Sequence, residues 1–385
     1  MKLQPIPQKI QQNNPKFGEQ KFNTLLIDGS NLLELSYYGC KKLSKYGNEV
    51  GGIYQFLLQI KIMLKKANFR YVYVFWDGDN SGQKRYNIYP LYKQNRDKDY
   101  YDDNLSDYMK RVNEKVKSMQ EHAYGKKRTR TELEKEQLFE QREIIMNCLE
   151  ELFVRQFIFD EVEADDLISY YVLHKKSNEK IVILSNDRDL IQLISNDVIV
   201  YIQSLSKFIN TRNCVEILGY DYRNVTIKKV ICGDASDNIK GIKGVGEKTL
   251  LNNFSELKER KVELNEIIDK AKNINEERLK NKKKPLKWAE NIVNSVTDGV
   301  QGNMIYVINN SLVDLMNPEC PMMTNDAKIG IKEAMYAPID PLGRSMTNLY
   351  NIVYDNGIED LMDETNFSNF FIEFTYLIER EKRNI

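Results

Sequence analysis

The amino-acid sequence predicts an α/β fold in which a mostly parallel sheet is flanked by helices. Three apolar runs with β-strand character each end in an aspartate: FNTLLID at 22–28, YVYVFWD at 71–77 and IVILSND at 181–187. Helical patterns lie between these runs, and residues 53–64, for example, place apolar side chains at i, i+3 and i+4. An alternation of strands with helices is typical of a parallel sheet.

The strand ends are the first candidate functional positions, because ligands of open α/β sheets bind beyond the carboxyl ends of the strands. The first run brings Asp28 to this edge, and the second brings Asp77. Residues 29–31, GSN, follow the first run and supply side chains that favour the start of a helix. We therefore expect Asp28, Asp77 and Asp187 to meet at a single edge of the sheet.

The segment EVEADDLISYYV at 161–172 predicts a helix with three acids at its start. A helix N-terminus favours anionic side chains, so capping accounts for one of Glu163, Asp165 and Asp166. Three acids exceed that need, because like charges about 4 Å apart repel by about 4 kcal/mol at an effective dielectric of roughly 20. Either a cation offsets this repulsion or the acids diverge into water. The apolar side of the helix comprises Val162, Ala164, Leu167, Ile168, Tyr171 and Val172.

Two further motifs carry paired aspartates. In SNDRDLIQL at 185–193, Asp187 and Asp189 follow a strand and precede an apolar helix, and a simple helix cap is the alternative interpretation. In GDASDN at 233–238, Asp234 and Asp237 share one face if the segment is a helical turn, and an ordinary turn is the alternative.

Taken together, these acids indicate a site for hard divalent cations. Oxygen ligands without histidine or cysteine suit Mg²⁺ or Mn²⁺, and only two histidines occur in the chain. The number of carboxylates suits two ions, of which one activates a water and the other stabilises the leaving oxygen.

The charge pattern indicates a nucleic-acid partner, although 56 Lys and Arg balance 56 Asp and Glu. Basic residues gather around 84–130, 240–248 and 280–287, and such surfaces meet phosphates. The five cysteines form no CxxC pair and are read as reduced thiols. The polar N-terminus lacks a signal-peptide core, and no apolar run approaches 18 residues, so we expect a cytoplasmic protein that crosses no membrane.

Six motifs resemble those of one enzyme family in their order and spacing: LLIDGSN, VFWDG, RYNIYPLYKQNR, VEADDLI, LSNDRDL and GDASDNIKGIKGVGEKT. The chain is similar over about 22–252 to flap endonucleases and bacterial or phage 5′–3′ exonucleases. It looks most like stand-alone phage enzymes such as the ribonuclease H of T-even phages. The resemblance implies a PIN-like α/β domain, a helix-two-turn-helix (helix-hairpin-helix) module and a helical C-terminal region.

This resemblance implies the following organisation. Residues 1–21 form a flexible arm, and 22–215 form the PIN-like nuclease domain with a helical arch at about 97–150. Residues 216–290 form the DNA-binding module with charged, solvated helices, and 291–385 form the C-terminal region. From composition alone, the highly charged stretch at 97–150 is read as an excursion from the core.

Roles of individual residues are implied by position in the motifs. The first metal would be held by Asp28, Asp77, Glu163 and Asp165, and the second held or organised by Asp187, Asp189, Asp234 and Asp237, while Asp166 matches a further acid of the family. Lys93 and Arg96 would stabilise charge at the scissile phosphate. Lys84 and Arg85 are further expected DNA contacts. In the arch, Lys126, Lys127, Arg128 and Arg130 would contact a single strand, with Tyr100, Tyr101 or Tyr124 stacking on its bases. In the hairpin, the expected contacts are Lys240, Gly241, Lys243, Gly244, Gly246, Lys248 and Thr249. The resemblance also implies a K⁺ at the hairpin.

The implied function is a structure-specific 5′ nuclease of DNA replication or repair that leaves a 5′-phosphate and a 3′-hydroxyl. Its substrates would be DNA with a 5′ flap or 5′ end and RNA–DNA hybrids, including RNA primers. We expect a monomer in a bacterial cell or phage-infected host, and a single-strand-binding protein or sliding clamp is a candidate partner without a supporting motif. The alternatives are a PIN-type endoribonuclease for single-stranded RNA, a non-catalytic DNA-binding replication factor and a small-molecule Mg²⁺ phosphohydrolase.

Overall fold

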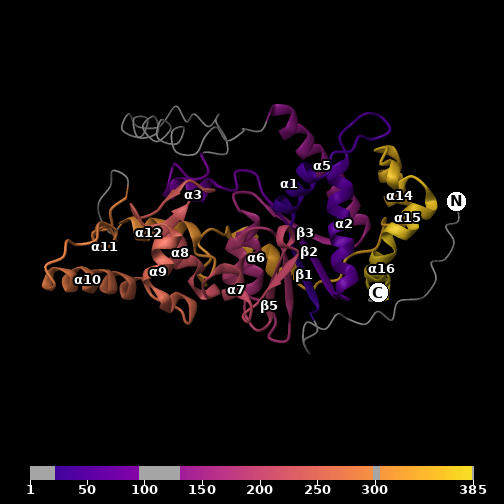
Figure 1. The fold of residues 1–385 in the computed structure, drawn as a ribbon. Coiled ribbons are helices and arrows are strands. Elements are labelled where there is room, and N and C mark those ends of the chain that lie inside the picture. The colour runs from indigo at the N-terminus through magenta and orange to yellow at the C-terminus, as the bar shows by residue number, and fades with distance from the viewer. Residues whose placement is uncertain (1–21, 95–130, 298–303, 384–385) are drawn as a thin grey trace. The chain divides into compact units, whose positions relative to one another are not determined.

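The computed structural model describes residues 22–94, 131–297 and 304–383 (Figure 1). The chain divides into two compact units. The first unit comprises Met1–Ser81, Glu136–Ile217 and Leu315–Ile385, and the second comprises Gly82–Lys135 and Leu218–Asp314. The expected boundary at 215/216 lies within two residues of this division, whereas the expected C-terminal region is shared, with 291–314 in the second unit.

The first unit is built on a mostly parallel sheet, as the sequence predicts. Within the described residues six strands form this sheet in the order β3-β2-β1-β4-β5-β6, and only the β5–β6 pair is antiparallel. Every residue of β1 is buried, as expected for a parallel strand whose two faces are both covered by helices. The strands are β1 (Thr24–Asp28), β2 (Tyr71–Asp77), β3 (Arg155–Phe159), β4 (Ile181–Leu184), β5 (Val198–Ile202) and β6 (Lys207–Ile209).

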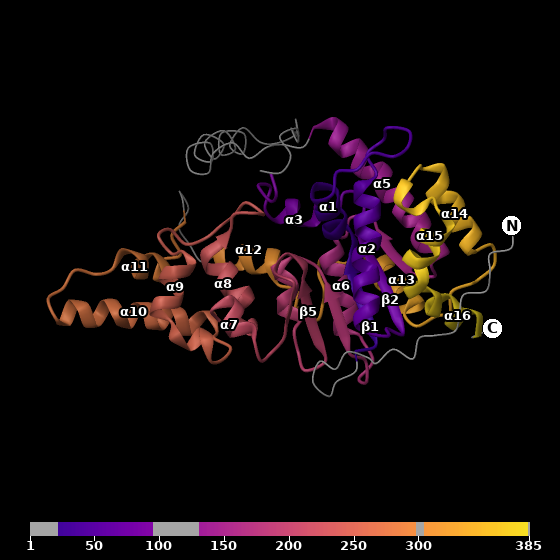
Figure 2. The same ribbon diagram turned by 45° about the vertical axis from the view of Figure 1, so that its right-hand side comes forward.

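Helices cover both faces of this sheet (Figures 1 and 2). One layer contains α1, α2 and the C-terminal helices α14–α16, and α6 packs on β1 and β2 from the other face. The helices of this unit are α1 (Gly29–Gly39), α2 (Gly51–Lys66), α5 (Glu132–Glu151, from Glu136 onward), α6 (Ala164–Leu173), α7 (Cys214–Leu218), α13 (Asn325–Ala334), α14 (Met346–Asp355), α15 (Glu364–Phe371) and α16 (Thr375–Arg383), with short 3₁₀ helices η1 (Arg188–Leu193), η2 (Gln203–Leu205), η5 (Glu359–Leu361) and η6 (Ile372–Phe374).

The core of the first unit combines both ends of the chain. Trp76 of β2 stacks on Phe56 of α2 with 5.6 Å between ring centroids. Phe367 and Phe371 of α15 belong to the same buried cluster. The C-terminal region is helical, as predicted, and its last helices complete the hydrophobic core beneath the sheet.

The predicted excursion at 97–150 needs correction at its C-terminal end. Residues 97–130 lie outside the described residues, but α5 follows them, and its second half is a core element. Ile145, Cys148 and Leu149 have no exposed surface and join the cluster around α2. The apolar positions of 145–149 recur at helical spacing, which the surrounding charges conceal in a reading of composition.

The second unit consists of short helices around a β-hairpin. Its elements are α3 (Gln83–Ile88), η3 (Tyr222–Asn224), α8 (Val225–Cys232), β7 (Gly233–Asp234), β8 (Ile239–Lys240), α9 (Glu247–Asn253), η4 (Ser255–Lys258), α10 (Leu264–Lys280), α11 (Lys287–Val293) and α12 (Met304–Val313). Helix α10 buries only Ile267 and Ala271, in agreement with a solvated helix.

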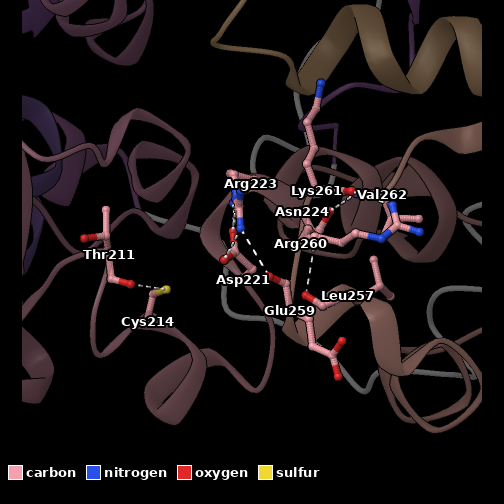
Figure 3. A network of polar contacts seen from close by, with 10 residues as sticks. All are labelled: Thr211, Cys214, Asp221, Arg223, Asn224, Leu257, Glu259, Arg260, Lys261 and Val262. Carbon is pink, nitrogen blue, oxygen red and sulfur yellow. Dashed lines mark hydrogen bonds and ion pairs between the residues drawn. The ribbon is translucent and has the colours of Figure 1, made fainter.

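A buried asparagine ties the segments of this unit together (Figure 3). Asn224 donates from Nδ2 to the carbonyl oxygens of Leu257 and Arg260 over 2.8 and 2.7 Å. Its Oδ1 accepts from the backbone N–H of Val262 over 2.9 Å. Beside it, Arg223 forms two hydrogen bonds to the carboxylate of Asp221.

In the described part of the chain, no helix is both long and apolar enough to cross a membrane.

Candidate metal centre and nucleic-acid interface

Asp28 stands where β1 ends and α1 begins. Its Oδ1 accepts from the N–H of Asn31 over 3.0 Å, so Asp28 itself caps α1, a role the sequence assigned to residues 29–31. Its Oδ2 accepts from the hydroxyl of Ser185, just beyond β4, over 2.9 Å. The carboxylate is therefore held by hydrogen bonds from residues that follow two different strands, β1 and β4.

The electrostatics of Asp28 show that other acids lie nearby. Burial raises its pKa to about 7, and the charges of Asp77 and then Asp187 act in the same direction. The hydrogen bonds from Asn31 and Ser185 oppose this rise but do not cancel it. The three strand-end aspartates therefore act on one another, as expected if they share an edge.

Asp77 links this group to the acid-rich helix. Its backbone N–H donates to Ser30 Oγ over 2.9 Å, and its Oδ1 accepts from the N–H of Ala164, the first residue of α6, over 2.8 Å. Glu163 occupies the N-cap position of α6, but its side chain makes no capping hydrogen bond. Asp77 thus accepts a hydrogen bond from the first N–H of α6, and a helix-capping role does not account for the acid at position Glu163.

The three acids of α6 do not diverge. One carboxylate oxygen from each of Glu163, Asp165 and Asp166 lies within 4.8 Å of the others. Glu163 and Asp166 are buried. Carboxylates gathered at this separation repel one another, and a divalent cation bound by the three oxygens would offset that repulsion.

Asp187 and Asp189 follow β4, at the same edge. Asp187 Oδ1 accepts from the N–H of Asp189 over 2.8 Å, so Asp187 is the N-cap of η1. The predicted apolar helix is a 3₁₀ helix, and its side chains from Asp189 to Leu193 are buried. The N–H of Asp187 donates to Ser185 Oγ over 2.9 Å, which places one serine between Asp28 and Asp187.

The first unit therefore brings a set of carboxylates to the carboxyl edge of its sheet, and the role of this set as metal ligands stays a prediction. Its donors fit a hard divalent cation, because they are carboxylates, largely buried and mutually repulsive without one. The set comprises Asp28, Asp77, Glu163, Asp165, Asp166, Asp187 and Asp189.

Asp234 and Asp237 belong to the second unit, and their share in a metal site stays a prediction. The segment is a β-hairpin with β7 and β8 as its strands, so the structure has the turn that the sequence left open and not the helical turn. Asp234 accepts from Lys229 Nζ over 2.5 Å and from the N–H of Ser236 over 2.8 Å. Burial raises the pKa of Asp234, but Lys229 and Ser236 outweigh it and lower the pKa to about 2.

The candidate basic residues after β2 differ in their surroundings. Arg85 is buried, with only 3% of its surface exposed, and its Nε donates to the carbonyl oxygen of Leu312 over 3.0 Å. Arg85 thus anchors α3 to α12, which argues against the DNA contact expected for it. Lys84 is partly exposed, and Lys93 has a left-handed backbone with φ of 51°.

Several expected DNA contacts lie outside the described residues. They are Arg96, Lys126, Lys127, Arg128, Arg130, Tyr100, Tyr101 and Tyr124.

The glycine-rich segment forms the expected loop between β8 and α9. Gly244 has φ of +77°, and a Cβ at Gly244 or Gly246 would meet open space. Lys243 and Lys248 are exposed, whereas Lys240, Gly241 and Thr249 are partly buried. The loop thus presents backbone and lysine side chains to solvent before α9.

Several residues that contact the candidate acids were not assigned to the site from the sequence. Ser185, Asn31 and Lys229 contact the candidate acids through hydrogen bonds or an ion pair. Ser185 and Asn31 each lie within three residues of a strand-end acid, which is a sequence signal for a supporting role. Nothing near Lys229 in the sequence distinguishes it from other lysines of a helix.

Comparison with known proteins shows which family this chain is similar to. A family model described as the N-terminal resolvase-like domain of 5′–3′ exonucleases matches residues 23–219. A 5′–3′ exonuclease of Mycoplasmopsis pulmonis is 29% identical over 262 residues, covering 66% of this chain and 75% of the relative. A 5′–3′ exonuclease of Halalkalibacterium halodurans is 31% identical over 242 residues, covering 59% of this chain and 67% of the relative.

The fold also matches a solved structure. A structure of the T5 5′-exonuclease superposes with a TM-score of 0.56 at 21% identity, covering 81% of this chain and 97% of that chain. At this identity the match supports the fold, a mostly parallel sheet flanked by helices.

Proposed function

This chain belongs to the 5′–3′ exonuclease family, and from that premise we propose that it is a structure-specific 5′ nuclease that cuts DNA with bound Mg²⁺. The observation that carries the proposal is the carboxylate set at the sheet edge. Glu163, Asp165 and Asp166 bring oxygens within 4.8 Å of one another, and Asp77 joins them to the strand ends. A family fold with this set intact supports a working nuclease over a non-catalytic DNA-binding factor.

The division of the acids between two cations follows from the resemblance to the family. Asp28, Asp77, Glu163 and Asp165 would hold one cation, and Asp187 and Asp189, with Asp234 and Asp237, would hold or organise a second. Divalent ions in such a site supply a nucleophile at neutral pH and neutralise charge on the reacting phosphoryl oxygens. A structure of T5 5′-exonuclease is described with bound divalent ions (zinc), which supports metal use here. Mn²⁺ is expected to substitute for Mg²⁺.

The protein's own residues would position the phosphodiester. Lys93 would place a positive charge near the scissile phosphate, where negative charge increases in the transition state. Hydrolysis then yields a 5′-phosphate and a 3′-hydroxyl, and no serine or cysteine nucleophile is required. The loop at Gly241–Gly246 would hold the duplex backbone, and we propose that a K⁺ binds there.

DNA is the proposed substrate because of the fold neighbours and the basic loop. A T5 D15 flap endonuclease variant, described as a pseudo-enzyme-product complex with DNA and metal ions, shares the fold with a TM-score of 0.53 at 19% identity. We propose DNA with a 5′ flap or 5′ end as the main substrate, with RNA–DNA hybrids as a second. Single-strand-binding protein and sliding clamp remain candidate partners.

The test is cleavage of end-labelled substrates. The protein should cut a 5′-flap duplex in Mg²⁺, stop when EDTA is added, and act on an RNA–DNA hybrid. The double variant Asp187→Asn/Asp189→Asn should bind flap DNA and lose cleavage. Asp197→Asn is the matched control, because Asp197 lies in the same unit before β5 and pairs with Lys175 and Lys180.

Two results would count against the proposal. Cleavage that survives in Asp187→Asn/Asp189→Asn would remove these acids from the site. A preference for plain single-stranded RNA over flap DNA would favour the endoribonuclease alternative.

A further inference from the structure

The turn between α10 and α11 carries a segregated positive charge. We name residues 278–287 the basic turn. This stretch holds six cations and no acid: Arg278, Lys280, Lys282, Lys283, Lys284 and Lys287. Lys282, Lys283, Lys284 and Lys287 are exposed. The rest of α10 differs, because its cations alternate with glutamates and an aspartate.

The basic turn has a defined conformation. The N–H of Lys283 donates to the carbonyl of Arg278 over 2.7 Å, and Arg278 Nε donates to the carbonyl of Lys284 over 2.8 Å. Asn275 closes the turn with two bonds to the backbone of Leu286, of 3.1 and 2.7 Å. The lysines therefore project from a fixed backbone, and less ordering is needed when they bind a partner.

Helix α11, which follows the basic turn in the chain, is connected to the glycine-rich loop. Asn291 of α11 donates from Nδ2 to the carbonyl of Lys243 over 2.8 Å, and the N–H of Lys243 donates to the carbonyl of Val296 over 2.8 Å. The two segments line one hollow, formed by Lys243, Gly244, Lys287, Trp288, Asn291 and Val296.

Trp288 forms the apolar wall of this hollow. Its ring meets Phe254 edge-on, with 6.1 Å between centroids and 78° between planes. The indole is thus held from behind while part of its surface stays accessible. Lysines that line the same hollow as a partly exposed indole suit a partner with both charged and apolar groups.

We propose that the basic turn and the glycine-rich loop form one continuous surface for the backbone of duplex DNA. Lys243 and the exposed lysines of the basic turn contact phosphates, and Trp288 packs against a sugar between Lys243 and Lys287. This proposal rests on the proposed function and adds a contact surface to it. The Lys287–Glu290 ion pair, 3.1 Å long and largely exposed, does not oppose binding, because such pairs contribute little and exchange readily.

Duplex DNA fits this surface better than a single strand. Single-stranded nucleic acid is bound by exposed aromatic rings on which successive bases stack. The basic turn offers clustered cations and one tryptophan that is half covered. Phosphates on a duplex are regularly spaced and densely charged, so contacts to them release counterions and give a salt-dependent affinity without sequence preference.

The test compares two variants with equal changes in net charge. The test variant is Lys283→Gln/Lys284→Gln/Lys287→Gln. The control is Lys258→Gln/Lys261→Gln/Lys272→Gln, which removes three lysines of the same unit outside the basic turn. Affinity for a fluorescent 5′-flap duplex and for a single strand is measured in EDTA, across a series of salt concentrations.

We expect the test variant to bind the duplex at least about 10-fold more weakly at low salt, with the salt slope reduced by about 2 to 3, because each lost phosphate contact removes about 0.9. The control should keep the wild-type slope. Trp288→Ala should weaken duplex binding without changing the slope. Equal losses in the test variant and the control, no loss in the test variant, or a larger loss on the single strand would overturn the proposal.

Failure of the proposed function would look different. In that case the wild-type protein itself would neither cut the flap duplex in Mg²⁺ nor bind it in EDTA.

Discussion

The backbone N–H of Lys93 donates a hydrogen bond to the backbone carbonyl of Asp237, with 2.9 Å between the two atoms. Beside it, the buried Asn238 donates from Nδ2 to the carbonyl of Leu91 over 2.7 Å. Lys93 and Asn238 both have left-handed backbones, with φ of 51° and 58°. The hairpin turn that carries Asp237 therefore fixes the backbone of the lysine proposed to act at the scissile phosphate.

Asn238→Asp should lower kcat by about 10-fold or more and leave KM nearly unchanged. The substitution keeps the shape of the side chain but replaces its donor with an acceptor, and small displacements of catalytic groups cost up to about 100-fold in rate. Steady-state cleavage of flap DNA measures the effect. Asn224→Asp is the control, because Asn224 is also a buried asparagine clamp of this unit and contacts no residue near Lys93 through its side-chain bonds.

The same variant allows a test of the coupling. If Asn238 acts through Lys93, the double variant Lys93→Ala/Asn238→Asp should be no slower than Lys93→Ala. Additive losses would contradict this. Hydrogen exchange of the segment around Lys93 should quicken in Asn238→Asp and not in Asn224→Asp.

Asp28→Asn should stabilise the metal-free protein in a pH-dependent way. Burial, Asp77 and Asp187 raise the pKa of Asp28 from 3.8 to about 7, so the folded state binds more protons than the unfolded state between these values. The stability contributed by the protonated group is complete below the unfolded pKa and is lost as pH rises to about 7, by about 1.4 kcal/mol per pH unit. In EDTA, the variant's gain in Tm over wild type should therefore grow from about pH 4 and level off above about 7. A pH-independent difference would contradict this.

Glu163→Gln/Asp165→Asn should abolish thermal stabilisation by divalent ions. A ligand that binds only the folded state stabilises it by about 2.7 kcal/mol at 100 times its Kd. Wild-type Tm should thus rise with added Mg²⁺ or Mn²⁺, whereas the variant should start from a higher Tm in EDTA and gain little. Asp197→Asn should respond as wild type. Differential scanning fluorimetry over a metal titration provides the measurement.

Arg85→Met should destabilise the protein by about 1–3 kcal/mol, because it leaves the carbonyl of Leu312 without its buried donor. Lys84→Met, at the neighbouring partly exposed position, should stay within about 0.5 kcal/mol of wild type. Urea unfolding followed by tryptophan fluorescence distinguishes the two. A fully stable Arg85→Met with weakened DNA binding would restore the surface role expected from the sequence.

Local patterns were sufficient for three strands of the sheet, β1, β2 and β4, and for the positions of the acids. The runs ending in Asp28 and Asp77 are strands because each is a continuous apolar stretch before its aspartate, as covered parallel strands require. The acids of 163–166 were recognisable because their number exceeds the needs of a helix start. For 233–240 the sequence left two readings open, because a spacing of three residues fits both a helical turn and the hairpin turn that is present.

The amino-acid sequence by itself determined the strands that end near Asp28, Asp77 and Asp187 and the acids that follow them, because these depend on neighbours a few positions away. Only the tertiary structure decided that Asp77 serves the start of α6, that Arg85 is buried and that α5 and α15 complete the core beneath the sheet. Each of these depends on a contact between residues far apart in the chain. Hydrophobic periodicity indicates that a side chain is buried, whereas the packing of the whole unit determines which residues it contacts.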